Sequence, residues 1–138
     1  MITRLDHIAI AVPDLDEAIR QFAEDLGLSF SGTEDVVSAQ TKTAFFPISG
    51  TQIELITPLD DQGPVKRSLE RRGPGLHHIC FETDNILEDM KRLREKGYIL
   101  LSDDPKPGAH GTLVVFVHPR STGGVLIELA QYSQHGES

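Results

Sequence analysis

Two histidines and two glutamates occupy matching places in two similar stretches of this sequence. His7 and His78 each stand before Ile and two positions after Leu, and they are 71 residues apart. Glu54 and Glu128 each stand between Ile and Leu, 74 residues apart. Two imidazoles and two carboxylates suit one divalent metal ion in octahedral geometry with two open positions. Cobalt, manganese, nickel, zinc and magnesium all fit these ligands, so the residues predict one divalent metal without naming it.

The recurrence gives the four residues more weight than any of them has alone. A single histidine in a half-buried strand is usually structural, and a strand glutamate between apolar residues usually faces solvent. His77 precedes His78 and points to the opposite face of a strand, so only one of the two can be a ligand. The match between the stretches selects His78, and the swapped assignment is the alternative. No thiolate is needed, so Cys80 stays outside the expected site.

A repeated order of strands and a helix must position these ligands. Alternation predicts a first strand at about 4–12, with His7 on one face and Ile8 on the other. Asp14 can cap a following helix that Gly27 ends. The apolar stripe of this helix comprises Leu15, Ala18, Ile19, Phe22 and Leu26. The further elements expected are strands near 28–32, 40–48 and 51–57, then a strand at 76–83, a helix at 85–96 closed by Gly97, and strands near 98–102, 111–118 and 124–131.

These elements predict an α+β fold in which two tandem βαβββ modules form an open, barrel-like cleft. A nearly constant spacing between several matching segments indicates a duplicated module. Residues 1–138 are expected to form a single domain, with module one at about 3–58 and module two at about 75–132. A linker at about 59–74 joins them, and Val65 to Arg72 predict a short helix inside it.

Composition and charge exclude several classes of function. The net charge of −8 argues against nucleic acid and membrane surfaces as partners, because proteins that bind them generally present a positively charged surface. The N-terminal residues lack a secretory signal pattern, and no apolar run is long enough to span a bilayer. One cysteine permits no internal disulfide, which fits a reducing compartment. We therefore expect a cytoplasmic protein.

The second half of the sequence carries the most specific resemblance. Leu5-Asp6-His7-Ile8, Ile53-Glu54-Leu55 and Gly75-Leu76-His77-His78-Ile79 resemble the vicinal-oxygen-chelate, or glyoxalase, superfamily. The stretch from Gly108 to Leu129 is similar to the methylmalonyl-CoA epimerases within it. It contains His118-Pro119-Arg120, then Gly123-Gly124-Val125-Leu126-Ile127-Glu128-Leu129. The resemblance covers residues 3–132.

The resemblance implies an activity and roles for several residues. Members interconvert (2R)- and (2S)-methylmalonyl-CoA in propionate metabolism by α-proton abstraction through a metal-stabilised enolate. Inversion needs acid–base groups on both faces of the α-carbon. Some members carry a catalytic Glu that aligns with Ala44, which cannot move a proton. Glu128 is then the best candidate for one base and Glu54 for the other, with Gln40, Lys42 or a metal-bound water as alternatives.

The same resemblance implies an acyl-CoA substrate and a homodimer. Arg120 and Ser121, beside the last ligand strand, are candidates for contacts with the coenzyme, as is Thr122. A cluster of cations on the linker helix is the alternative, although charged helix faces are usually only solvated. This cluster comprises Lys66, Arg67, Arg71 and Arg72.

Three other functions share parts of this pattern. A lactoylglutathione lyase would use the same metal ligands, but the stretch from 108 to 129 disfavours it. An extradiol dioxygenase uses two His and one Glu around iron, and a fourth protein ligand would crowd its substrates. A non-enzymatic binding protein of the same fold would need no complete ligand set.

Overall fold

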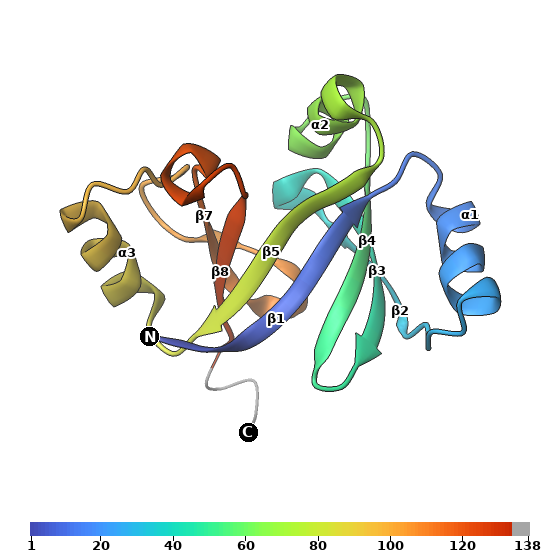
Figure 1. Cartoon of the computed structure of the whole chain (residues 1–138), viewed down its shortest axis with the longest axis horizontal. Helices are drawn as coiled ribbons and strands as arrows, with labels where there is room; N and C mark the ends of the chain where they lie inside the picture. The colour runs from blue at the N-terminus through green and yellow to red at the C-terminus, as the bar shows by residue number, and fades with distance from the viewer. Residues whose placement is uncertain (134–138) are drawn as a thin grey trace. The chain divides into compact units, whose positions relative to one another are not determined.

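The computed structural model describes residues 1–133, whose helices and strands are drawn in Figure 1. The double βαβββ order and the α+β class predicted from the sequence are confirmed. The first copy contains β1 (Ile2–Ala11), α1 (Leu15–Arg20), β2 (Gly32–Val36), β3 (Thr41–Ile48) and β4 (Thr51–Pro58). Helix α2 (Pro64–Arg72) follows. The second copy contains β5 (Gly75–Thr83), α3 (Ile86–Glu95), β6 (Lys106–Pro107), β7 (Leu113–Val117) and β8 (Ile127–Gln131).

The chain divides into two compact units whose boundaries fall inside strands β1 and β5. We call His7–His77 the N-terminal unit, and Met1–Asp6 with the residues from His78 onward the C-terminal unit. The division differs in detail from the predicted modules, because α2 belongs to the N-terminal unit and the start of β1 belongs to the C-terminal unit. Each unit is described by itself below.

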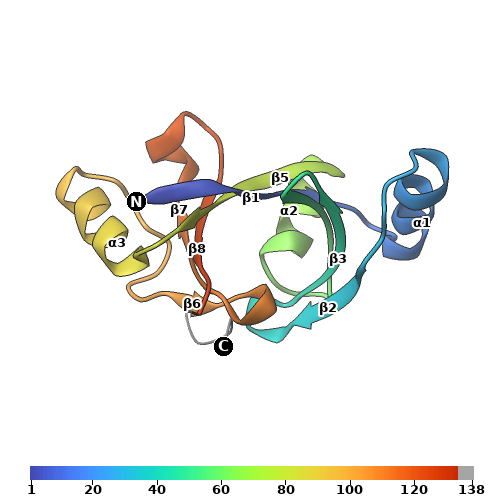
Figure 2. The same cartoon turned by 90° about the horizontal axis from the view of Figure 1, so that it is seen from below.

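In the N-terminal unit, the strands form a sheet in the order β2-β3-β4-β1. The pair β1–β4 is parallel, and the other two pairs are antiparallel. One face packs against α1 through a cluster that includes Val12, Leu15, Ala44, Phe46 and Leu55. We call this the outer face. The other, inner face packs against α2 through Ala9, Ala11, Ile56, Val65 and Leu69. Figure 2 shows the two helices on opposite sides of this curled sheet.

In the C-terminal unit, the strand order is β5-β8-β7-β6, and the first residues of β1 run beside β5. The Thr3 hydroxyl donates to the carbonyl oxygen of Glu82 over 3.3 Å. Helix α3 covers the outer face of this sheet through an apolar cluster that contains Ile86, Met90, Val115 and Leu129. Val114, Ala130 and Cys80 are buried on the other, inner face. Both units therefore bury one helix on the outer face of a mixed sheet.

Local sequence signals account for the helix ends. The Asp14 carboxylate accepts from the backbone N–H of Glu17 over 3.1 Å, so the predicted cap of α1 is confirmed. Asn85 caps α3 in the same way. The first helix continues beyond α1 as a π-helical turn at Gln21–Asp25. Gly27 and Gly97 follow the two helices with φ of 83° and 88°, which suits glycine at such ends.

Four details of the predicted elements are wrong. The strand expected near 28–32 lies at Gly32–Val36, because the backbone N–H of Leu28 donates back to Phe22 and prolongs the helix end. Leu26 is 67% exposed, so it does not belong to the apolar stripe. The strand expected near 98–102 is reduced to an isolated bridge at Leu100. Strand β8 starts only at Ile127, because the left-handed turn at Gly123 and Gly124 precedes it.

Within residues 1–133, no helix is long and apolar enough to cross a membrane.

Candidate metal and active site

In the N-terminal unit, His7 and Glu54 form a buried pair on the inner face. Ala9 on β1 pairs with Glu54 on the parallel strand β4, and His7 lies two residues before Ala9 on the same face. His7 Nδ1 and Glu54 Oε2 are 3.1 Å apart. The two residues are only 7% and 6% exposed. A buried carboxylate and imidazole need such a partner, because each alone loses its hydration without compensation.

In the C-terminal unit, His78 and Glu128 repeat this arrangement. Cys80 on β5 pairs with Glu128 on the parallel strand β8, and His78 lies two residues before Cys80. His78 Nε2 and Glu128 Oε1 are 3.0 Å apart. The ring of Phe116 meets the His78 ring edge-on, with centroids 5.2 Å apart. Alternation along β5 puts the side chain of the neighbouring His77 on the other face of the strand.

A phenylalanine flanks each glutamate in the same register. Phe45 on β3 pairs with Glu54, and Phe116 on β7 pairs with Glu128. The two units thus present the same local arrangement of histidine, glutamate and aromatic ring. The duplication that the sequence predicts therefore extends to the register of the strands.

The spacing inside each pair suits two ligands of one cation. Two ligands at right angles in an octahedral shell, each about 2.1 Å from the ion, lie about 3 Å apart. The His–Glu distances of 3.1 Å and 3.0 Å match this value. Imidazole and carboxylate donors also suit the divalent ions expected from the sequence. Each unit therefore carries half of a ligand set that fits the predicted metal.

Ala44 lies on the outer face and not beside Glu54. It pairs with Leu55, whereas Glu54 pairs with Phe45. Ala44 is fully buried in the apolar cluster under α1. A carboxylate at position 44 would point into that apolar cluster and away from Glu54. The expectation that a catalytic base of other family members aligns with Ala44 is therefore wrong. Lys42 also lies on the outer face, is exposed, and pairs with Thr57.

Comparison with known proteins identifies the family. The model of the Glyoxalase/Bleomycin resistance protein/Dioxygenase superfamily matches residues 6–116. The ethylmalonyl-CoA/methylmalonyl-CoA epimerase of Cereibacter sphaeroides is 42% identical over 133 residues, covering 95% of this chain and 99% of that protein. The chain belongs to the methylmalonyl-CoA epimerase family of this superfamily.

Solved structures of methylmalonyl-CoA epimerases agree with this assignment. The enzyme from Mycobacterium tuberculosis has a TM-score of 0.91 and 33% identity, covering 97% of this chain and 91% of its own. A methylmalonyl-CoA epimerase in complex with methylmalonyl-CoA and NH4+ has a TM-score of 0.91 and 31% identity, covering 97% of both chains. The family resemblance stated from the sequence is therefore confirmed.

The residues expected to bind the coenzyme lie in a turn of the C-terminal unit, at Pro119–Thr122. The Ser121 hydroxyl oxygen accepts from the backbone N–H of Ile99 over 3.0 Å. The Thr122 hydroxyl donates to the carbonyl oxygen of Val125 over 2.6 Å. These bonds hold the turn, while the Arg120 side chain extends from it into solvent. The arginine is thus the member of this turn best able to meet a phosphate.

The cations of α2 form a second candidate in the N-terminal unit. Lys66 Nζ lies 4.0 Å from Glu70, and Arg72 donates to the Ser68 hydroxyl over 3.1 Å. Among residues 1–133, no carboxylate forms an ion pair with Arg67 or Arg71. An anion could therefore meet two guanidinium groups on this helix.

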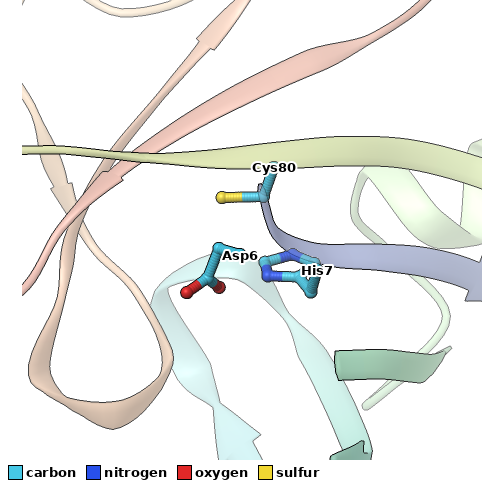
Figure 3. Close-up of side chains that lie close together, drawn as sticks. All are labelled: Asp6, His7 and Cys80. Carbon is cyan, nitrogen blue, oxygen red and sulfur yellow. The ribbon is translucent and has the colours of Figure 1, made fainter. Parts of the chain in front are cut away.

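Cys80 stands beside Glu128 in register, but its surroundings do not make it a ligand. It is fully buried, and its Sγ donates weakly to the Phe81 carbonyl over 3.8 Å. Its Sγ also lies within 4.8 Å of a carboxylate oxygen of Asp6, which Figure 3 shows below it. That carboxylate accepts from the Tyr132 hydroxyl over 2.7 Å and from Arg4 over 3.0 Å. These partners satisfy Asp6 without a metal.

Sequence reasoning missed one carboxylate on the inner face of the N-terminal unit. Glu34 on β2 pairs with Thr43 on β3, whose side chain faces the same side of the sheet as Glu54. The expected strand at 28–32 ended before Glu34 and therefore hid this position. Residues 32–36 place Thr33, Glu34 and Asp35 in a row, so no alternation of polar and apolar residues marked this strand in the sequence.

Proposed function

We propose that this chain is an isomerase that interconverts the (2R) and (2S) epimers of methylmalonyl-CoA. The observation that carries the proposal is 42% identity with an epimerase of that substrate over nearly the full length of both chains. The complex of another family member with methylmalonyl-CoA supports an acyl-CoA substrate. The two buried His–Glu pairs agree with the chemistry, because the family's reaction builds negative charge next to the α-carbon.

One divalent cation held by His7, Glu54, His78 and Glu128 is part of this proposal. Two observations support it: each unit buries one His–Glu pair, and the spacing within each pair suits neighbouring ligands. When bound, such a cation would act as a Lewis acid that stabilises negative charge on the substrate oxygens. The candidate ions for this site are cobalt, manganese, nickel, zinc and magnesium.

The carboxylates of the chain then move the proton. Glu128 is proposed to exchange a proton with the α-carbon on one face, because it combines a carboxylate with a fixed position beside His78. Symmetry between the repeats offers Glu54 for the other face. Phe45 and Phe116, which flank the two glutamates, provide apolar surroundings that strengthen electrostatic interactions with the substrate.

The coenzyme is proposed to contact Arg120 and Ser121. The Ser121 hydroxyl oxygen accepts one hydrogen bond, and its hydroxyl hydrogen can donate to a phosphate. The arginines of α2 are the alternative. A cytoplasmic homodimer completes the proposal, on the grounds given by the sequence and the family.

Turnover of four compounds tests the proposed reaction. The purified, cobalt-loaded protein is incubated with (2S)-methylmalonyl-CoA, (2R)-methylmalonyl-CoA, ethylmalonyl-CoA and the methylglyoxal–glutathione hemithioacetal. We expect each methylmalonyl-CoA epimer to convert to the other in deuterated water with uptake of deuterium at the α-carbon. Activity on the hemithioacetal alone would instead identify a lactoylglutathione lyase. Binding without turnover or deuterium uptake would identify a non-enzymatic binding protein.

A further inference from the structure

Glu34 places a third carboxylate on the inner face of the N-terminal unit. Along the sheet, Glu34 pairs with Thr43, and Thr43 pairs with Ile56. Residues that pair directly across strands have side chains on the same face. Glu54 lies two residues before Ile56, so Glu34 shares its face with both Glu54 and Ile56.

The burial of β2 confirms that Glu34 faces inward. Gly32, Glu34 and Val36 are half-buried, whereas Thr33 and Asp35 are exposed. Thr43 lies between Glu34 and β4, the strand that carries Glu54. It is small and only 3% exposed. The glutamate side chain is therefore able to extend along the sheet surface toward a substrate beside Glu54.

The fold does not require a carboxylate at this place. In the C-terminal unit the matching position is Lys106, which pairs with Val114 as Glu34 pairs with Thr43. Val114 in turn pairs with Ala130, two residues after Glu128. The strand accepts a cation there, and this lysine is exposed. An acidic group at position 34 is thus a property of this chain and not of the repeated architecture.

Building on the proposed function, we propose that Glu34 is the second proton-transfer group of the epimerase. Its carboxylate takes the α-proton from one epimer, and the electron pair of the C–H bond moves toward the thioester carbonyl. A protonated carboxyl group on the opposite face, for which Glu128 is proposed, returns a proton to the α-carbon. Exchange with solvent resets both groups, and the reverse reaction exchanges their roles.

Glu34 suits this role better than Glu54. Glu54 is bound to His7 over 3.1 Å and is proposed to ligate the metal. If both ligand carboxylates loosened to move protons, the cation would lose half of its protein ligands. Glu34 belongs to no proposed ligand set, so it can change protonation state without loss of the cation.

Deuterium exchange measured separately from each epimer tests the proposal. Wild type, Glu34→Gln and the control Asp35→Asn are compared in deuterated water, with metal content measured in each. Asp35 neighbours Glu34 on the same strand but is exposed on the other face. For Glu34→Gln we expect epimerisation to fall by about 100-fold or more. Exchange into one epimer should persist within about threefold of wild type, because one base still acts.

The results separate this proposal from the one on which it rests. If wild type does not epimerise methylmalonyl-CoA, the proposed function fails. If wild type is active and Glu34→Gln matches Asp35→Asn in both exchange rates, Glu34 is not a base. An equal loss of exchange from both epimers would indicate a structural role and would also overturn the proposal. One-sided exchange in Glu34→Gln, with wild-type metal content and with wild-type exchange in Asp35→Asn, would support it.

Discussion

Buried ionisable pairs distinguish the inner faces of both sheets. His7 and Glu54, like His78 and Glu128, are almost inaccessible to solvent. Such pairs contribute little net stability, because the loss of hydration offsets much of their attraction. Apolar residues of similar volume would serve the core as well. The conservation of this pattern between the two repeats of one chain therefore indicates function at these residues.

Asp89 in α3 shows the opposite, structural use of a buried carboxylate. Thr83 donates a short hydrogen bond to it, Arg92 Nη2 lies at 2.7 Å and the Met1 amino group at 3.2 Å. Burial by itself raises the pKa of Asp89, but these partners outweigh burial. The pKa of Asp89 in the folded protein therefore lies below its ordinary value of 3.8.

We predict that Asp89→Asn lowers the free energy of unfolding by about 3 kcal/mol at pH 7. Because the folded-state pKa of Asp89 is depressed, its ionised form stabilises the fold above the ordinary, unfolded pKa of 3.8. This stabilisation is lost as the pH falls through the folded pKa. Urea unfolding at pH 7 and pH 3 should therefore show a smaller difference between variant and wild type at pH 3. Asp104→Asn, an exposed control, should behave as wild type, and a difference independent of pH would contradict this account.

Among the elements, helix α2 packs on the inner face of the sheet in the N-terminal unit. Val65 and Leu69 of this helix pack on Ala9, Ala11 and Ile56, beside the strand positions of His7 and Glu54. Gly63 precedes the helix with φ 105° and ψ 171°, a conformation that only glycine adopts readily. A Cβ at this position would lie 3.0 Å from Gln40 Cβ. The start of the helix thus depends on this glycine.

Gly63→Ala should therefore lower the free energy of unfolding by about 3 kcal/mol. Gly50→Ala is the matched control, because Gly50 has φ of 81° but no atom within 4 Å of an added Cβ. It should cost about 1 kcal/mol, from backbone strain alone. Urea unfolding measures both values. Equal losses in the two variants would show that the contact with Gln40 has no effect.

For the whole molecule, the proposed metal requires ligands from both copies of the repeat. A ligand that binds only the folded state at 100 times its dissociation constant stabilises it by about 2.7 kcal/mol. We predict that cobalt chloride raises the melting temperature of chelator-stripped protein by roughly 8 °C. Differential scanning calorimetry measures this shift, which does not depend on any activity.

Two variants show whether the shift comes from the proposed ligands. His78→Ala should abolish it, because one ligand is lost. Cys80→Ala, two residues further on the same face of β5, should keep it. A shift that survives in His78→Ala, or that disappears in Cys80→Ala, would contradict the proposed ligand set.

Much of this protein could be predicted from the sequence because it contains the same module twice. Similar spacing between His7 and His78 and between Glu54 and Glu128 predicted the ligand set that is now proposed. Periodicity predicted most strands and helices. These signals are local, since alternation and capping depend on residues close in the chain. The family followed from a stretch whose residues stand together in sequence.

Only the tertiary structure determined which side chains share a face across several strands. Register between strands depends on contacts distant in sequence, and a shift of one residue moves a side chain to the other face. That is why Ala44 lies under α1 and not beside Glu54. It is also why Glu34, on a strand misplaced by local signals, proved to face the same side as the predicted ligand. The residue types were present in the sequence, but their common face arises only when the strands pair.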